Sequence, residues 1–274
     1  MIMRKKVFLK KFSIWFMAVL FTIAFAIYQR MTGPTYPIKD KIEIANTTVS
    51  YKFLRTWGDD SDAPIKIKVP KEVEGKVIWK RFKSHDNWAI TDMERDGAFL
   101  IFGIPHQPPA GKVMYEVYLM ADHKEYALQD EPVVIRFKGH VPSWIVILHV
   151  FFIFGAMLMS TRTGLEVLTR GVNTYRFTII TVLFWMVGGF VFGPIMQKYA
   201  FGAYWTGWPF GTDLTDNKSL VALLFWFFAW YKLYKNPNNK WAPLLAAIIM
   251  ITVFLIPHSM LGSELDHTAM NINP

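Results

Sequence analysis

The 274-residue sequence contains no cysteine. Without thiols the chain forms no disulfide, and it offers no thiolate ligand for a metal and no attachment point for a c-type haem. A folded region outside a membrane must therefore be held together by its apolar core. Acidic residues are also missing from the N-terminus, where five basic residues precede the first apolar run: Arg4, Lys5, Lys6, Lys10 and Lys11. A basic N-terminus of this kind is typical of a segment that stays on the cytoplasmic side of a membrane.

Long uncharged runs are what the sequence has in excess. Hydrophobic residues make up 53% of the chain, with 23 Phe, 11 Trp and 11 Tyr, which is more than an ordinary soluble domain carries. Five runs stand out, at 13–28, 141–160, 177–197, 219–231 and 241–257. Most approach the roughly 20 residues that a helix needs to cross the hydrocarbon, and the fourth does so only if it extends to Tyr234. We therefore predict a membrane α-helical bundle of about five transmembrane helices.

The distribution of charge predicts the orientation of these helices. Five crossings place segments 161–176 and 232–240 on the same side as the N-terminus, and each segment carries three basic residues against at most one acid. The loop 198–218, on the opposite side, has two lysines and two aspartates. Because cytoplasmic loops are enriched in Lys and Arg, the N-terminus is expected inside, and the region before residue 141 and the C-terminus outside.

The distribution of charged residues along the chain also excludes a nucleic-acid partner. The chain has a formal net charge of +9, yet residues 30–142 carry 17 basic and 16 acidic side chains. The excess positive charge lies on the inner segments, where its natural partners are the anionic headgroups of the lipid bilayer. No basic stripe is left over to bind a phosphate backbone.

The first apolar run has two interpretations. Ala24-Phe25-Ala26 has the small-x-small form of a signal-peptide cleavage site after a basic segment. The run continues through Tyr28, however, and Gln29-Arg30 follows at once, as at the end of a membrane anchor. Either interpretation leaves the orientation of the rest of the chain unchanged.

The region between the first two apolar runs has the pattern of half-buried β-strands. Apolar and polar residues alternate at 49–53, 65–69 and 133–137, and further β-rich runs occur at 75–82, 98–104 and 112–120. Turn signals separate them, so six or seven short strands predict an extracytoplasmic all-β immunoglobulin-like sandwich. The expected domains are a transmembrane anchor at 1–30, the sandwich at 31–140, and a four-helix transmembrane domain with ordered outer loops at 141–274.

Polar residues gather in the loop before the fourth apolar run and after the fifth. The candidate outer-face site comprises Trp205, Trp208, Asp213, Asp216, Asn217, Lys218, His258, Ser259, Glu264 and Asp266. The two aspartates, each preceded by a threonine, have the form of N-cap signals for the following helix. Alternatively, the carboxylates, hydroxyls and imidazole converge to hold a metal ion, although no spacing is diagnostic of a metal site. The first interpretation predicts that Asp216→Asn changes little.

His149 is the one ionisable side chain deep inside an apolar run. It is expected to face other helices, because lipid cannot satisfy its ring nitrogens. It is either a neutral histidine hydrogen-bonded to a neighbouring helix or, together with His258, an axial ligand of a b-type haem. We expect no cofactor, with the haem and a metal ion as alternatives.

Three stretches carry a resemblance to other proteins. They are VVIRFKG at 133–139 followed by Val141-Pro142, STRTGLE at 160–166, and the segment from Trp205-Thr206-Gly207 to Lys218. With them the chain resembles a group of uncharacterised bacterial inner-membrane proteins that have an N-terminal anchor, an immunoglobulin-like outer domain and a C-terminal helical membrane region. The resemblance implies the bacterial inner (cytoplasmic) membrane, with the β-domain and the C-terminus periplasmic. It implies no activity and no catalytic residue.

Three function classes remain. The favoured one is a non-enzymatic accessory or assembly protein of the envelope whose outer β-domain and loops bind a partner protein. A membrane redox or metal-binding protein is the alternative, using His149, His258 and the outer carboxylates. A transporter of a small solute or ion is third, because apart from His149 the apolar runs offer only hydroxyls such as Ser160, Thr178 and Thr181. No spacing of Ser, His and Asp predicts an enzyme.

Overall fold

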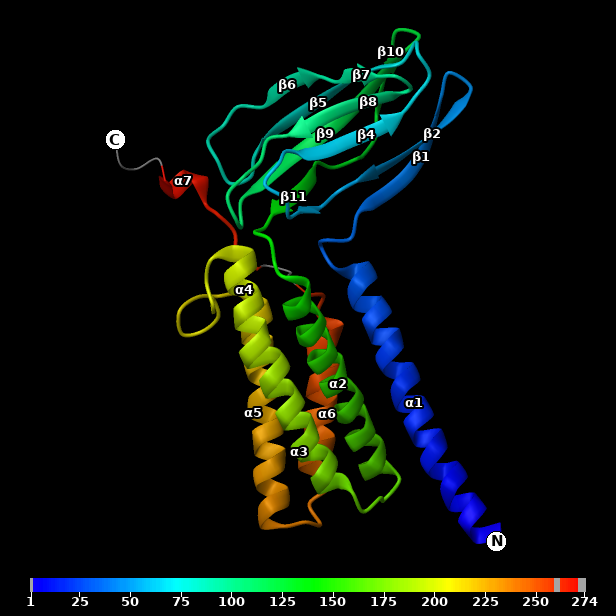
Figure 1. Cartoon of the computed structure of the whole chain (residues 1–274), viewed down its shortest axis with the longest axis vertical. Coiled ribbons are helices and arrows are strands. Elements are labelled where there is room, and N and C mark those ends of the chain that lie inside the picture. Colours follow the sequence, from blue (N-terminus) through cyan, green and yellow to red (C-terminus); the bar gives the residue numbers. More distant parts are fainter. Residues whose placement is uncertain (1, 259–261, 271–274) are drawn as a thin grey trace. The chain divides into compact units, whose positions relative to one another are not determined.

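The computed structural model describes residues 2–258 and 262–270, which divide into a mainly helical unit and a mainly β unit (Figure 1). Within the described residues, the helical unit contains 2–34, 141–199, 203–258 and 262, and the β unit contains 35–140, 200–202 and 263–270. Residues 200–202 and 263–270 lie within the region 141–274 that was predicted to be the transmembrane domain. In the structure both segments belong to the β unit.

The helices follow the apolar runs and extend beyond them. They are α1 (Ile2–Thr32), α2 (Ser143–Leu168), α3 (Thr174–Trp185), the π-helix η1 (Met186–Phe192), α4 (Gly193–Phe201), α5 (Leu214–Lys235) and α6 (Trp241–Leu255). In the described part of the chain, three segments are long and apolar enough to cross a membrane: Leu9–Thr32, Ser143–Leu168 and Thr174–Phe201. α6 is apolar but has only 15 residues, and α5 has 22 residues with charged side chains near both ends.

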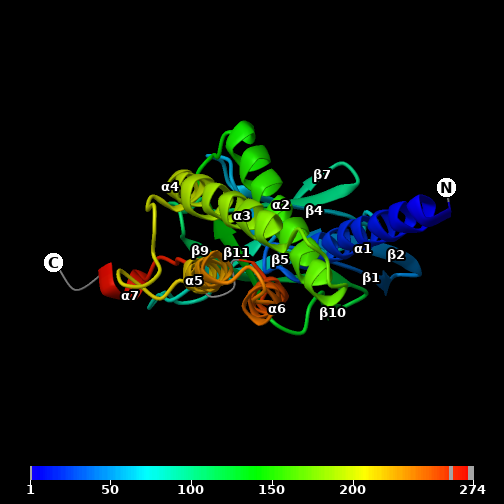
Figure 2. The same cartoon turned by 90° about the horizontal axis from the view of Figure 1, so that it is seen from below.

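Four helical segments form a closed ring. α2 packs on α3, α3 on α5, α5 on α6 and α6 on α2, with α1 against α2 and α6 (Figures 1 and 2). The ring encloses a core built around the fully buried Trp226 and Met250. Small residues on the inner faces allow the helix backbones to approach closely: Ala156, Ala222, Ala229, Ala242, Ala246 and Ala247.

The third apolar run, predicted at 177–197, forms a helical segment that extends beyond both of its ends. Phe192-Gly193-Pro194 does not interrupt this segment, because η1 leads directly into α4, which continues to Phe201. Because α4 starts at Gly193, Pro194 lies in its first turn, where a missing backbone N–H costs little. The proline therefore does not break the helical segment.

The β unit contains three sheets. Its strands are β1 (Ile38–Ile44), β2 (Thr47–Phe53), β3 (Thr56–Trp57), β4 (Ala63–Lys68), β5 (Glu74–Arg81), β6 (Ala89–Asp92), β7 (Glu94–Asp96), β8 (Phe99–Ile104), β9 (Lys112–Ala121), β10 (Lys124–Ala127) and β11 (Val133–Phe137). β1 pairs with β2, the second sheet has the order β4-β8-β7, and the third has the order β3-β11-β9-β5-β6 with β10 also paired to β9. Only the β3–β11 pair is parallel among the pairs described.

The six strands predicted by position are confirmed as β2, β4, β5, β8, β9 and β11. The described residues hold eleven strands rather than six or seven, because several of the additional ones have only two to four residues. Such short pairings carry too little alternation to be detected by period alone.

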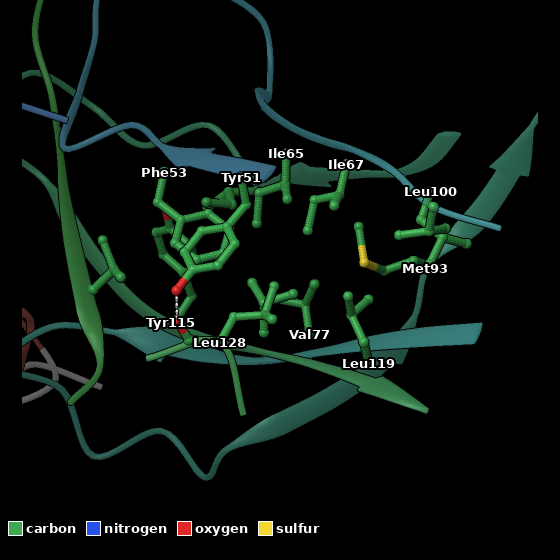
Figure 3. Close-up of a cluster of buried hydrophobic side chains, with 14 of the residues drawn as sticks. Tyr51, Phe53, Ile65, Ile67, Val77, Met93, Leu100, Tyr115, Leu119 and Leu128 are labelled. Carbon is green, nitrogen blue, oxygen red and sulfur yellow. Dashed lines mark hydrogen bonds between the residues drawn. The ribbon is translucent and has the colours of Figure 1, made fainter. Parts of the chain in front are cut away.

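One apolar core joins the three sheets. Side chains of Ile65 and Ile67 from β4 point toward those of Val77 on β5 and Leu119 on β9 (Figure 3). The alternation is almost regular along β9, where every second residue from Val113 to Ala121 is buried. This core takes the place of the disulfides that a cysteine-free domain cannot form.

The C-terminal segment is fastened to the β unit. The Leu265 N–H donates to the Ala110 carbonyl, and the His267 N–H donates to the Lys83 carbonyl, both over 3.0 Å. The short helix α7 (His267–Met270) follows. The segment thus adds backbone hydrogen bonds to one end of the β unit.

Candidate functional site

The polar residues at the start of α5 brace the loop that precedes it. We call residues 203–213 the aromatic loop. Asp213 is the N-cap of α5, and its Oδ1 accepts from the N–H of Thr215 (2.8 Å) and, over 3.4 Å, from that of Asp216. A side-chain oxygen at this position satisfies N–H groups that have no partner within the helix. Asp213 therefore acts as the cap that the sequence analysis proposed.

Asp216 reaches back into the aromatic loop. Its Oδ2 accepts from the Thr206 N–H (2.7 Å), from Gln197 Nε2 (3.2 Å) and from the Thr206 hydroxyl (3.3 Å). Burial raises the pKa of this carboxyl group, although the hydrogen bond from Thr206 opposes the shift. The side chain thus ties the loop to both α4 and α5.

Asn217 and two glycines also hold the aromatic loop against α5. The Trp208 N–H donates to Asn217 Oδ1 (2.6 Å), and the Trp205 indole donates to the Trp208 carbonyl (3.1 Å). A Cβ on Gly207 would lie 2.5 Å from Cβ of Asp216, and a Cβ on Gly211 would lie 2.3 Å from a backbone oxygen of the loop. Only glycine fits at these two positions, so the loop packs tightly against the first turn of α5.

The braced loop presents aromatic side chains to its surroundings. Phe210 is 83% exposed, Trp208 68% and Tyr204 59%. Hydrogen bonds from the N–H groups of Thr206 and Trp208 to Asp216 and Asn217 hold the loop that carries them. An exposed apolar cluster of this kind marks a surface that contacts lipid or another protein.

Lys218 lies one residue before the apolar part of α5, and its side chain contacts the end of α6 rather than the aromatic loop. Its Nζ donates to the carbonyl of Ile256 (2.7 Å) and, over 3.4 Å, to that of Pro257. The Lys218 side chain is buried. A cation at the C-terminal end of a helix interacts favourably with the unpaired carbonyls there.

Residues at the end of α1 also form hydrogen bonds with the end of α6. Gln29 Nε2 donates to the carbonyl of Ile256 (3.1 Å), and its Oε1 accepts from the His258 N–H (3.0 Å). The Tyr28 hydroxyl donates to the carbonyl of Leu255 (2.9 Å). The His258 side chain is exposed, and Ser259 lies outside the described residues. These contacts fasten α1 to the end of α6.

The last two predicted site residues belong to the β unit. Glu264 is paired there with Lys83 and, at 2.5 Å, with Lys112. Burial pushes the pKa of Glu264 up, but the hydrogen bonds from the two lysines outweigh it and the pKa lies below its usual value. Asp266 Oδ1 accepts from the N–H of Thr268 (2.9 Å). Each predicted carboxylate thus has polar partners inside its own unit.

His149 has the kind of partner that the sequence analysis expected. Its Nδ1–H donates to the carbonyl of Gly188 in η1, over 3.0 Å. Gly193 N–H donates to the same carbonyl. A Cβ on Gly188 would lie 2.9 Å from the backbone nitrogen of Ile153, so the two helices are in close contact at this point. The histidine therefore joins α2 to the π-helix.

Arg162 and Glu166 form a buried charged pair that was not predicted from the sequence. Residues 161–176 were interpreted as a connecting loop, but α2 continues to Leu168 and buries Arg162 (3% exposed) with Glu166 (4% exposed). Arg162 Nη2 lies 2.6 Å from Glu166 Oε2. The spacing of four residues, which places both on one helix face, was the available signal.

Among the described residues, no group of three or more His, Asp or Glu side chains is placed to hold a metal ion. Comparison of the chain with protein-family models, with curated proteins and with solved structures found no match.

Proposed function

We propose that the protein is an accessory or assembly protein of the bacterial inner membrane, which uses the aromatic loop to bind another envelope protein. The observation that supports it is the exposure of Trp208 and Phe210 on a loop that is held to α5 by hydrogen bonds. The polar side chains around them, Asp213, Asp216 and Asn217, are occupied in holding the loop. The loop therefore offers shape and apolar surface rather than reactive groups. Protein interfaces favour such aromatic anchors, which lose little conformational entropy on binding.

The proposal includes five membrane spans with the aromatic loop on the periplasmic side. α5 and α6 lie in the same ring as α2 and α3. They join the three long apolar helices as the fourth and fifth spans, with α6 about 22 Å long at 1.5 Å per residue. The hydrogen bonds from Tyr28 and Gln29 to the end of α6 support a retained N-terminal anchor. The bilayer is then the first partner of the protein.

The β unit is proposed to be an immunoglobulin-like sandwich in the periplasm. Its support is the single core shared by the β1–β2 and β4–β8–β7 sheets and the six-stranded sheet. Sandwich domains of this kind serve mainly as binding or spacing modules, and fold alone assigns no chemistry. The β unit is accordingly proposed as a second contact for the partner.

The metal or redox alternative has less support. It drew on His149, His258 and the carboxylates near α5. His149 Nδ1 is hydrogen-bonded to the Gly188 carbonyl, and Asp213 and Asp216 bind the aromatic loop and the first turn of α5. These contacts favour structural roles for the same side chains.

A photo-crosslinking amino acid at position 210 tests the proposed function. In intact cells we expect a discrete protein adduct from this position, because Phe210 faces the proposed partner. The matched control is position 231 in α5, where Tyr231 is exposed on the helix surface. That position should give lipid adducts only. Lipid adducts alone from both positions would contradict the proposal and assign the aromatic loop to the headgroup layer.

A further inference from the structure

The C-terminal segment 263–267 contacts the β unit in the manner of a bound peptide. Every second residue of the segment bonds to the β unit through its backbone: the Ser263 carbonyl accepts from Arg136 Nη2, the Leu265 N–H donates to the Ala110 carbonyl, and the His267 N–H donates to the Lys83 carbonyl. Alternate backbone contacts of this kind are typical of an extended chain added to the edge of a folded domain. The segment therefore binds the β unit as an extended ligand does.

Glu264 supplies the charged contact of the segment. Its carboxylate is paired with Lys83, which follows β5, and at 2.5 Å with Lys112, the first residue of β9. Within the described part of the chain, Glu264 is the only acid that forms a salt bridge with either lysine. Hydrogen bonds between ionised groups are shorter and stronger than neutral ones. The two ammonium groups therefore form a site that selects a carboxylate.

The two carbonyls that receive the segment belong to residues in an uncommon conformation. Lys83 has a φ of 48° and Ala110 a φ of 69°, in the left-handed region that residues other than glycine rarely adopt. In the described β unit, the other such residues are 45–46 and 122–123, which form the two-residue turns of the β1–β2 and β9–β10 hairpins. Residues held in this region outside such turns cluster at sites that clamp a ligand. Lys83 and Ala110 therefore have the character of a binding site.

The β unit builds its core without the segment. None of the described residues 263–270 is among the buried apolar side chains that form this core. Residues 263–265 are half-buried and Asp266 is exposed. His267 is buried, yet its Nε2 has no hydrogen-bond partner within the described residues, and an unpaired buried polar atom opposes binding. The segment thus occupies the site without completing the fold, and its own fit is imperfect.

We propose that this site binds an acidic extended segment of a partner protein, and that residues 263–267 occupy it until the partner displaces them. The bound segment defines the chemistry of the ligand. It requires a glutamate for the two lysines, followed one and three residues later by backbone N–H groups for the two carbonyls. The inference rests on the proposed role of the β unit as a second contact for the partner, and it names what that contact recognises.

A labelled peptide tests the site in the purified full-length protein. The probe is fluorescein-labelled GSELDHT, the sequence of residues 262–268, and its binding in detergent is followed by fluorescence anisotropy. Wild type should bind it weakly, because a covalently joined segment competes at a high effective concentration. A double variant, Glu264→Gln with Leu265→Pro, loses the carboxylate and the N–H that donates to Ala110. It should release the segment and bind the peptide at least tenfold more tightly than wild type.

Two comparisons make the test specific to the carboxylate. The same peptide with glutamine in place of its glutamate should bind the double variant about tenfold more weakly. Adding Lys112→Gln to the double variant should abolish binding of the original peptide. Lys124→Gln is the matched control, because Lys124 is an exposed lysine on β10, and it should leave binding unchanged.

Several results would overturn the inference. They are the absence of saturable binding by the double variant, equal binding of the two peptides, and equal effects of Lys112→Gln and Lys124→Gln. Loss of the folded β unit in the double variant, seen in its thermal unfolding, would also overturn it, because the segment would then be part of the fold. Each of these results leaves the crosslinking experiment at position 210 unaffected, so a failure of this site is distinguishable from a failure of the aromatic loop to bind a partner.

Discussion

Asp216→Ala should loosen the aromatic loop without unfolding the helix ring. The substitution removes the acceptor of the Thr206 N–H, which donates over 2.7 Å, and of the Thr206 hydroxyl and Gln197. A hydrogen bond to a charged group contributes about 1.5–3 kcal/mol, and an acid in the first turn of a helix adds about 0.3–1 kcal/mol. Part of this is recovered by water, because Thr206 is only half-buried. We expect a net loss of about 2 kcal/mol in the free energy of opening the loop.

Hydrogen exchange measured by mass spectrometry reports this opening directly. A loss of about 2 kcal/mol corresponds to about 30-fold faster exchange in peptides that cover the aromatic loop. Asp216→Asn keeps an oxygen acceptor and should accelerate exchange less than about fivefold, a cost below about 1 kcal/mol. Asp92→Ala, which removes an exposed carboxylate from β6, is the control and should leave the loop unchanged. Equal effects of the alanine and asparagine variants, or no effect of either, would refute the inference that the Asp216 carboxylate holds the aromatic loop in place.

Three further predictions concern the β unit and the topology. Phe53→Ala should cost about 3–5 kcal/mol in the free energy of unfolding of the β unit, because Phe53 is buried in its core, whereas Ile90→Ala on the surface should cost under about 0.5 kcal/mol; denaturant titration measures both. Burial and the nearby charge of Arg81 lower the pKa of His267 below the ordinary histidine value of about 6.5. Below about pH 6.5 the unfolded chain therefore binds a proton at His267 more readily than the folded chain does, so stability should fall as the pH drops through this range. Thermal midpoints compared at pH 5 and pH 7.5 measure the loss, which should be smaller in His267→Leu. A single cysteine placed at Phe210 should react with a membrane-impermeant maleimide in intact cells, and one at Asn238 only after lysis; the reverse pattern would invert the proposed topology.

Local periodicity accounts for what the sequence predicted well. The alternation at 133–137 and 112–120 reflects strands with one face in the core, and period two is visible without knowing the partner strand. The need of His149 for a polar partner also follows from one residue and its surroundings. Its actual partner, the Gly188 carbonyl, depends on how α2 packs against η1 and has no signal in the sequence.

The residues that were misjudged depend on contacts between distant segments. Lys218 was predicted only as a member of the candidate outer-face site, and no sequence pattern indicated that its Nζ donates to the carbonyls of Ile256 and Pro257 at the end of another helix. Arg162 lies beyond the apolar run and resembles a loop residue with positive-inside character. Its burial results from α1 and α3, which supply the rings of Trp15 and Phe177. No pattern within α2 alone contains that information.

The extended helices have a related cause. Helix α2 continues through polar residues after its apolar run because Glu166 is paired with Arg162 and with the Asn173 N–H. Likewise α4 continues beyond Pro194 because the proline occupies the first turn after η1. In both segments polar or helix-breaking residues are accommodated by local pairing. Hydropathy by itself places the helix ends too early.

Binding of a partner by the aromatic loop is the central claim, and a paired-variant co-purification tests it most directly. The partner that crosslinks to position 210 is quantified after gentle solubilisation of wild type, of Trp208→Ala with Phe210→Ala, and of Tyr231→Ala with Tyr234→Ala as an exposed aromatic control on α5. Removal of two aromatic anchors should reduce recovery of the partner at least tenfold, since such residues dominate binding energy, while the control keeps it. Equal recovery with all three proteins, each still folded, would contradict the account.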